Sequence, residues 1–228
     1  MKILYKITFW TFCCMLILLI TNCEQVITDY GNDCALSGFV KDQSGNIVPG
    51  DITSTNLSVK ALGEGDVVTT DMRVKGDGFF QNTKLFPKKY RIWVTGPVTL
   101  VDDTLRVDFS VDKVLVRDFV VTPFLTLKKP TIVGSPAATT VDVSYEITAN
   151  SGKTVSKRQL YCSTKQNPNA STGSGAFYST KTVTLTTNSG NASVTGLTSK
   201  TKYYIRIGAQ ATGATGFNYS EQIEITTL

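Results

Sequence analysis

Apolar and polar residues alternate along three stretches of the chain, residues 105–112, 141–147 and 203–209. A period of two residues is typical of a β-strand with one buried face. In the last stretch the pattern places Tyr203 inward and Arg206 on the opposite, outward face. No apolar stripe of helical period follows residue 23. We therefore predict an all-β chain built as two tandem antiparallel β-sandwich domains.

Turn-forming residues separate the strands, and prolines mark the domain boundary. The turn signals are Ser44–Asn46, Gly76–Gly78, Asn150–Gly152 and Ser189–Asn191. Pro130 and Pro136 bracket the start of a new block of strands, and proline cannot donate a hydrogen bond to a sheet. We place the two sandwiches at residues 34–127 and 128–228, each of a size typical of a small domain.

The N-terminus has the pattern of an export signal. Two lysines precede residues 7–20, which are apolar apart from two threonines and are too short to span a bilayer comfortably. This predicts a signal peptide over residues 1–22, with a retained membrane-anchor helix as the alternative. Leu19–Cys23 resembles a bacterial lipobox, although Asn22 stands where Gly or Ala is usual. The resemblance implies lipidation of Cys23, with residues 23–33 forming a tether.

Composition removes several kinds of chemistry. The 228 residues contain no histidine, which excludes an imidazole base and imidazole metal ligands. The net charge of +5 is not gathered into a basic cluster, so we expect no nucleic-acid binding. No CxxC pair, calcium loop or phosphate loop is present. Paired acids such as Asp108 and Asp112 fall on the expected solvent face of a strand. We expect no metal, no cofactor and no enzymatic activity.

Motifs in each half resemble known domains. Residues 36–50 form a Gly-x-Val-x-Asp-x-x-Gly hairpin, followed by Asp77–Phe79 and the strand Tyr90–Ile92. This order resembles the carboxypeptidase-regulatory-like, transthyretin-like sandwich, and it implies a core that includes Phe79, Leu85, Tyr90 and Ile92.

The second half contains residues 196–207, which resemble a fibronectin type III turn with Ser199 and Lys200 in place of Pro-Gly. The resemblance makes Tyr203 the tyrosine of a tyrosine corner. It also puts Tyr145 where the family usually has a core tryptophan.

The lipobox, the two domains and residues 118–125 together resemble a family of outer-membrane lipoproteins from glycan-foraging gut bacteria. The resemblance implies an outer-membrane, lipid-anchored protein at the cell surface, with the periplasmic face as the alternative. It carries over no catalytic or binding residues.

Exposed aromatic residues are the best candidates for a binding site. If Tyr90 and Ile92 face the core, Trp93 lies on the opposite face beside Arg91. An aromatic face flanked by polar donors suits carbohydrate recognition. A second candidate patch in the other half consists of Phe177, Tyr178, Phe217 and Tyr219. The alternative for Trp93 is burial between the two domains.

We therefore expect a non-catalytic lipoprotein that assists glycan capture beside an outer-membrane nutrient importer. Its expected partners are the membrane, a polysaccharide and components of the importer. The alternative is a structural or protein-interaction scaffold that binds no carbohydrate.

Overall fold

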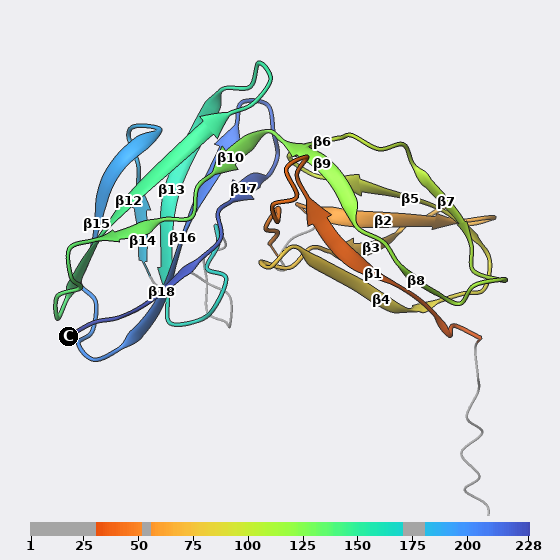
Figure 1. Cartoon of the computed structure of the whole chain (residues 1–228), viewed down its shortest axis with the longest axis horizontal. Coiled ribbons are helices and arrows are strands. Elements are labelled where there is room, and N and C mark those ends of the chain that lie inside the picture. The colour runs from red at the N-terminus through yellow and green to blue at the C-terminus, as the bar shows by residue number, and fades with distance from the viewer. Residues whose placement is uncertain (1–30, 52–55, 171–180) are drawn as a thin grey trace, which may run out of the picture. The chain divides into compact units, whose positions relative to one another are not determined.

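The protein, as a computed structural model, is described over residues 31–51, 56–170 and 181–228 (Figure 1). All the regular secondary structure in these ranges is β-strand, so the expected all-β fold is confirmed. The signal-peptide prediction and Cys23 lie outside the described residues. None of the described residues forms a helix long and apolar enough to cross a membrane. Both sandwiches belong to one compact unit, residues 32–228.

The first sandwich contains the strands from β1 to β9. One sheet has the order β4-β1-β9-β6, with β8 also paired to β1, and the other has the order β3-β2-β5-β7. The strands are β1 (Cys34–Lys41), β2 (Ser58–Gly63), β3 (Thr70–Arg73), β4 (Phe79–Leu85), β5 (Lys89–Thr95), β6 (Val98–Leu100), β7 (Leu105–Asp108), β8 (Val114–Val116) and β9 (Phe119–Pro123).

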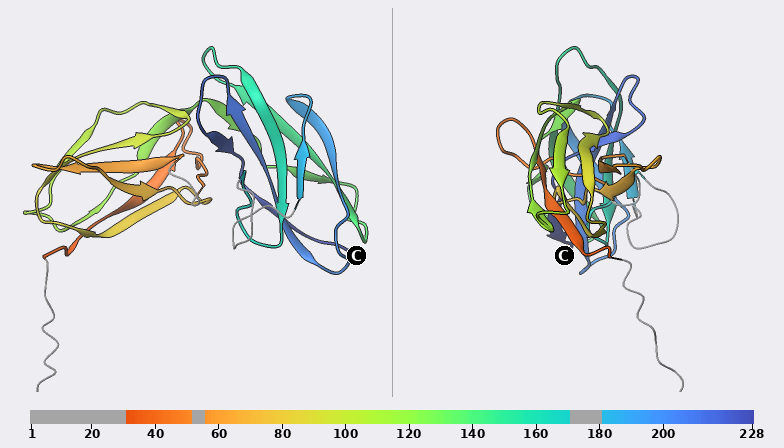
Figure 2. Two further views of the ribbon diagram at one scale, coloured as in Figure 1. Left: turned by 180° about the vertical axis from the view of Figure 1, so that it is seen from behind. Right: turned by 90° about the vertical axis from the view of Figure 1, so that its right-hand side faces the viewer.

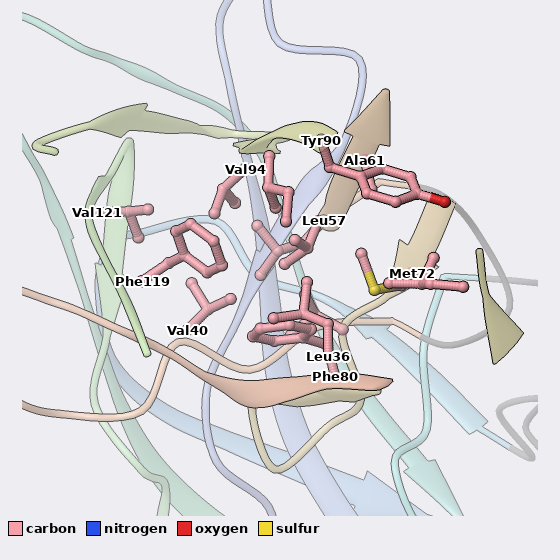
Figure 3. Close-up of a cluster of buried hydrophobic side chains, with 14 of the residues drawn as sticks. Leu36, Val40, Leu57, Ala61, Met72, Phe80, Tyr90, Val94, Phe119 and Val121 are labelled. Carbon is pink, nitrogen blue, oxygen red and sulfur yellow. The ribbon is translucent and has the colours of Figure 1, made fainter. Parts of the chain in front are cut away.

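Apolar side chains from both sheets fill the space between them (Figure 3). Leu36 and Phe80 come from one sheet and are fully buried, and Val94 comes from the other and is nearly so. Phe79, expected in this core, is only half-buried on the opposite face, where its ring lies 5.3 Å from that of Phe39. The motif resemblance selected the wrong one of two adjacent phenylalanines, because only one of two successive strand residues can face the core.

Two features of the first sandwich differ from the prediction. The sheet is not purely antiparallel, because β8 and β9 both pair with β1 in parallel. They are separated at Asp118, whose carboxylate accepts hydrogen bonds from the Phe39 N–H at 2.9 Å and the Lys41 ammonium at 2.6 Å. The strand expected over residues 105–112 ends at Asp108, because that carboxylate accepts hydrogen bonds from the Ser110 N–H and hydroxyl and closes a turn.

The second sandwich contains the remaining strands. One sheet has the order β10-β12-β11, with β15 also on β12, and the other has the order β14-β13-β16-β17, with β18 also on β16. The strands are β10 (Leu125–Leu127), β11 (Thr131–Val133), β12 (Thr140–Ala149), β13 (Val155–Ser163), β14 (Lys181–Thr184), β15 (Ser189–Thr195), β16 (Lys202–Ala211), β17 (Phe217–Tyr219) and β18 (Ile223–Thr226). Figure 2 shows both sandwiches in two further views.

The structure corrects the expected boundary between the sandwiches. Residues 125–127 pair with β12, and Leu125 is buried in the second hydrophobic cluster. The chain therefore leaves the first sandwich after Pro123, not at residue 128. Pro130 separates β10 from β11, two strands that both pair with β12. The proline signal marked an interruption within the second sandwich.

Local geometry near the start of β16 explains the fibronectin-like turn. Tyr203 is 4% exposed, and its hydroxyl accepts a hydrogen bond from the Thr198 N–H at 3.0 Å. Lys200 has φ of +52°, so the residue in place of the usual glycine keeps a left-handed backbone conformation. Tyr145 is 6% exposed within the second core. The turn expected over residues 189–191 is instead the first part of β15.

Candidate functional site

The outward face of the sheet β3-β2-β5-β7 carries Trp93. On β5, Tyr90, Ile92 and Val94 are at most 4% exposed and belong to the core. The strand alternation therefore turns Trp93 away from the core, where it is half-buried, next to exposed Arg91. This is the orientation that the sequence pattern gives.

Charged neighbours surround Trp93 on this face. Across the sheet, Trp93 pairs with Lys60, and Lys60 pairs with Asp71. The Lys60 ammonium lies 2.6 Å from an Asp71 carboxylate oxygen. Burial opposes ionisation of Asp71, but the hydrogen bonds from Lys60 and the Thr69 hydroxyl outweigh it and lower the pKa of Asp71. The carboxylate is therefore ionised at neutral pH, next to the lysine that separates it from Trp93 across the sheet.

A hollow of about 500 Å³ extends the same face toward the ends of β2, β5 and β7. Arg91 lines it and pairs across the sheet with Leu62 and Arg106. Asp66 and Asp108 also line it. The face therefore combines one indole, two guanidinium groups and several carboxylates, the groups that sugar rings and hydroxyls contact. The open sheet suits a chain that lies across it.

The predicted aromatic patch of the second half is not an exposed surface. Phe177 and Tyr178 lie outside the described residues. Tyr219 is 4% exposed, and its hydroxyl donates to the Asp51 carboxylate at 3.2 Å and accepts from the Ala170 N–H. Phe217 is half-buried and stacks on Tyr219 with ring centroids 6.0 Å apart. The expectation that Tyr219 offers a carbohydrate platform is wrong, because Arg206, Tyr161 and Phe217 of the same sandwich and Asp51 of the first lie around it.

Arg206 is the residue whose environment the sequence did not predict. It occupies the outward face of β16, as the alternation requires, yet it is fully buried. Its guanidinium donates to the carbonyls of Pro168, Asn167 and Gly50, the last at 3.2 Å in the first sandwich, and lies 4.0 Å from the centre of the Tyr219 ring.

Burial lowers the pKa of Arg206 to about 10, so the group remains charged at pH 7. The strand carried one signal that this face is covered. Gly208 lies two residues further along, and a Cβ there would come within 2.6 Å of the Tyr161 ring. Glycine inside a strand often marks a close approach of other atoms.

A cleft of about 670 Å³ lies beside this contact. Asp51, Asn56 and Phe217 are among its lining residues. The Asn56 side-chain amide donates to the Phe217 carbonyl at 2.8 Å, which adds to the hydrogen bonds between the two sandwiches. The aromatic residues of this contact are Tyr161, Phe217 and Tyr219, whereas Trp93 is not among the residues that line the cleft.

The remaining candidate groups show no reactive arrangement in the described parts of the chain. No three His, Cys, Asp or Glu side chains gather there into a metal site. Cys34 and Cys162 are free and buried in different hydrophobic clusters. Burial raises the pKa of Cys162 to about 12, so that thiol is protonated at neutral pH.

Comparisons with known proteins bear on the fold. A scan against protein-family models finds no match, and none of the curated proteins matches. The crystal structures that resemble this one include three that cover most of the chain. A DUF3823 family protein from Parabacteroides merdae has a TM-score of 0.66 at 19% identity, covering 85% of this chain and 98% of its own. The chain shares the fold of these proteins.

The other two are equally similar. A DUF3823 family protein from Bacteroides ovatus has a TM-score of 0.64 at 15% identity, covering 86% of this chain and 100% of its own. A protein from Bacteroides uniformis named a putative carbohydrate binding protein has a TM-score of 0.64 at 20% identity, with the same coverage. The likeness extends over nearly the whole length of each of the three proteins, and so includes both sandwiches.

Proposed function

We propose that this protein is a non-catalytic, lipid-anchored cell-surface protein that binds a polysaccharide on the outward face of the sheet β3-β2-β5-β7. One observation carries the proposal: Trp93, the one tryptophan of the chain after the predicted signal peptide, is half-buried on that face and is not among the residues that line the cleft between the sandwiches.

The surroundings of Trp93 support a sugar ligand. A partly covered indole is held firmly while one part remains available to the C–H surface of a sugar ring. The ion pair of Lys60 and Asp71 on one side and the Arg91 guanidinium on the other offer hydrogen-bond donors and acceptors to the hydroxyls. The name of the structurally similar Bacteroides uniformis protein points to the same ligand class.

The lipobox at Cys23 and the apolar run before it support an anchored protein in this proposal. Polysaccharide bound to such a protein would be held close to the membrane, where a nutrient importer takes it up. The chain contains no histidine, and the two described cysteines are buried thiols with no disulfide bond. Both features favour binding over catalysis.

Affinity electrophoresis tests the binding step. Native gels are cast with a panel of plant and host polysaccharides, and the wild-type chain is compared with Trp93→Ala. Phe86→Ala is the matched control, because it removes an exposed aromatic side chain, 46% exposed, that is not part of this face. We expect one polymer to retard the wild type and Phe86→Ala, and to retard Trp93→Ala far less.

Retention of all three proteins by a polymer would place the binding site elsewhere. If no polymer retards the wild type, the carbohydrate proposal is wrong and the scaffold alternative becomes the better account.

A further inference from the structure

One end of the first sandwich gathers three connections and the start of β1. The register sets this arrangement: Cys34 pairs with Leu85, Gly63 with Tyr90, and Lys89 with Asp108. Residues 64–69, 86–88 and 109–113 therefore lie at the same end as residues 32–33 (Figures 1 and 2). We call this surface the entry end, because the chain enters the first sandwich there.

Large apolar side chains project from the entry end. Val67 is 98% exposed, Val111 76% and Val68 74%, and Val114 and Phe86 are also exposed. Single exposed apolar residues are ordinary on protein surfaces. Here five of them come from three segments distant in sequence and meet at one end, and such a gathering indicates an interaction surface.

Ion pairs neutralise charges around these side chains. The Lys88 ammonium lies 2.5 Å from an Asp66 carboxylate oxygen, and the Lys113 ammonium contacts the Asp33 carboxylate. Unpaired charges near apolar tips would make contact with a hydrocarbon layer costly. These two pairs lower the charge at this end, where Glu64 and Asp112 add further exposed carboxylates. An apolar surface bounded by polar groups suits the interfacial region of a lipid bilayer.

The short distance in sequence between the lipidation site and the entry end favours the bilayer as the partner of this surface. Cys23, the proposed lipidation site, precedes Cys34 by eleven residues. An extended chain spans at most about 3.5 Å per residue, so the entry end would lie within about 40 Å of an acylated cysteine. The tether therefore keeps the entry end, where the chain joins the first sandwich, within reach of the membrane.

We propose that the entry end docks on the lipid bilayer by inserting Val67, Val68 and Val111 at the interface. This inference rests on the lipid anchor of the proposed function. Docking would fix the orientation of the first sandwich, with β1 rising from the membrane and the Trp93 face standing beside it. The first sandwich would then keep a fixed orientation on the membrane instead of moving freely on its tether.

Depth-dependent fluorescence quenching tests this inference on the complete, acylated protein in phosphatidylcholine vesicles. A cysteine-reactive environment-sensitive dye is attached at Val67→Cys, and at Ser44→Cys as the control. Ser44 is exposed in the connection after Lys41, at the opposite end of β1. The two native cysteines described by the structure are fully buried and do not compete for the dye.

We expect nitroxide lipids to quench the dye at Val67→Cys at least about twofold more than at Ser44→Cys, with blue-shifted emission. Adding Val111→Asp to Val67→Cys should reduce that difference, because Val111 is exposed and its replacement leaves the core intact. Equal quenching at the two positions, or none at either, overturns docking.

Flotation of the same samples separates the two proposals. Vesicles that float with the protein while neither dye is quenched would contradict docking and leave the anchor standing. Protein that does not float would contradict the anchor and docking together. In the unacylated Cys23→Ser protein without vesicles, a blue shift that grows with protein concentration would show that a second copy of the chain covers this end, and would also overturn the proposal.

Discussion

Arg206→Met removes the buried cation that joins the sandwiches while keeping a side chain of similar length. In the wild type the guanidinium satisfies the carbonyls of Gly50, Asn167 and Pro168 and lies over Tyr219. Methionine can fill the space but cannot donate a hydrogen bond. The variant therefore leaves up to three carbonyls without this donor.

The expected loss follows from these contacts. A hydrogen bond from a charged donor contributes about 1.5 kcal/mol at the lower end of its range, and three give about 4.5 kcal/mol. Methionine avoids the cost of burying a charge, which returns part of this amount. We expect the free energy of unfolding to fall by about 3 kcal/mol, within the range for disrupting a buried polar network.

Urea unfolding followed by circular dichroism and by Trp93 fluorescence measures this loss. Lys202→Met is the matched control, because Lys202 lies on the same strand but is exposed, with its ammonium 2.6 Å from Glu224. Exposed pairs add little to stability, so the control should unfold like the wild type. A midpoint unchanged in Arg206→Met, or lowered equally in both variants, would refute the role given to the buried guanidinium.

Three further predictions concern single groups. Tyr203→Phe should lower the free energy of unfolding by about 1–2 kcal/mol, measured by urea titration, because the Thr198 N–H loses its acceptor. Burial opposes ionisation of Asp118, but the hydrogen bond from Lys41 outweighs it and lowers the pKa of Asp118 below 3.8. The ionised carboxylate therefore stabilises the folded state above pH 3.8, and this stabilisation is lost as the pH falls through the lower pKa of the folded state. Melting temperatures at pH 6 and pH 2 should therefore differ more for the wild type than for Asp118→Asn, and equal differences would contradict this. Cys162 should react with a thiol reagent at pH 8 only after denaturation, and rapid reaction of the native protein would contradict its burial.

Alternation predicted the orientation of side chains better than the length of strands. It placed Trp93 outward and Tyr203 inward, as the structure does. It extended one predicted strand past Asp108 to residue 112. The strand ends at Asp108 because the carboxylate of that residue accepts hydrogen bonds from the Ser110 N–H and hydroxyl, and these bonds do not change the alternation of apolar and polar residues. Period-2 patterns record which face is buried, not where the backbone turns.

The contacts between the two sandwiches could not be predicted from the sequence pattern of single strands. Arg206 is outward on its own sheet and becomes buried because residues 167–168 of the second sandwich and Gly50 of the first lie over it. The same covering removes Tyr219 from the surface. Neither strand contains information about a segment more than 150 residues earlier in the chain. Gly208 indicates only that the rings of Tyr161 and Tyr219, from neighbouring strands of the same sheet, pack closely on this face. The parallel pairing of β8 with β1 escaped prediction for a similar reason, since pairing partners are distant in sequence.

The emission of Trp93 during titration with a polysaccharide tests the central claim most directly. The chain without its predicted signal peptide contains this single tryptophan, so any change in indole emission reports on the proposed face. We predict a saturable change in intensity or wavelength with the polymer that retards the protein in native gels. A polymer that retards the protein without altering Trp93 emission would contradict the claim that the carbohydrate binds on this sheet.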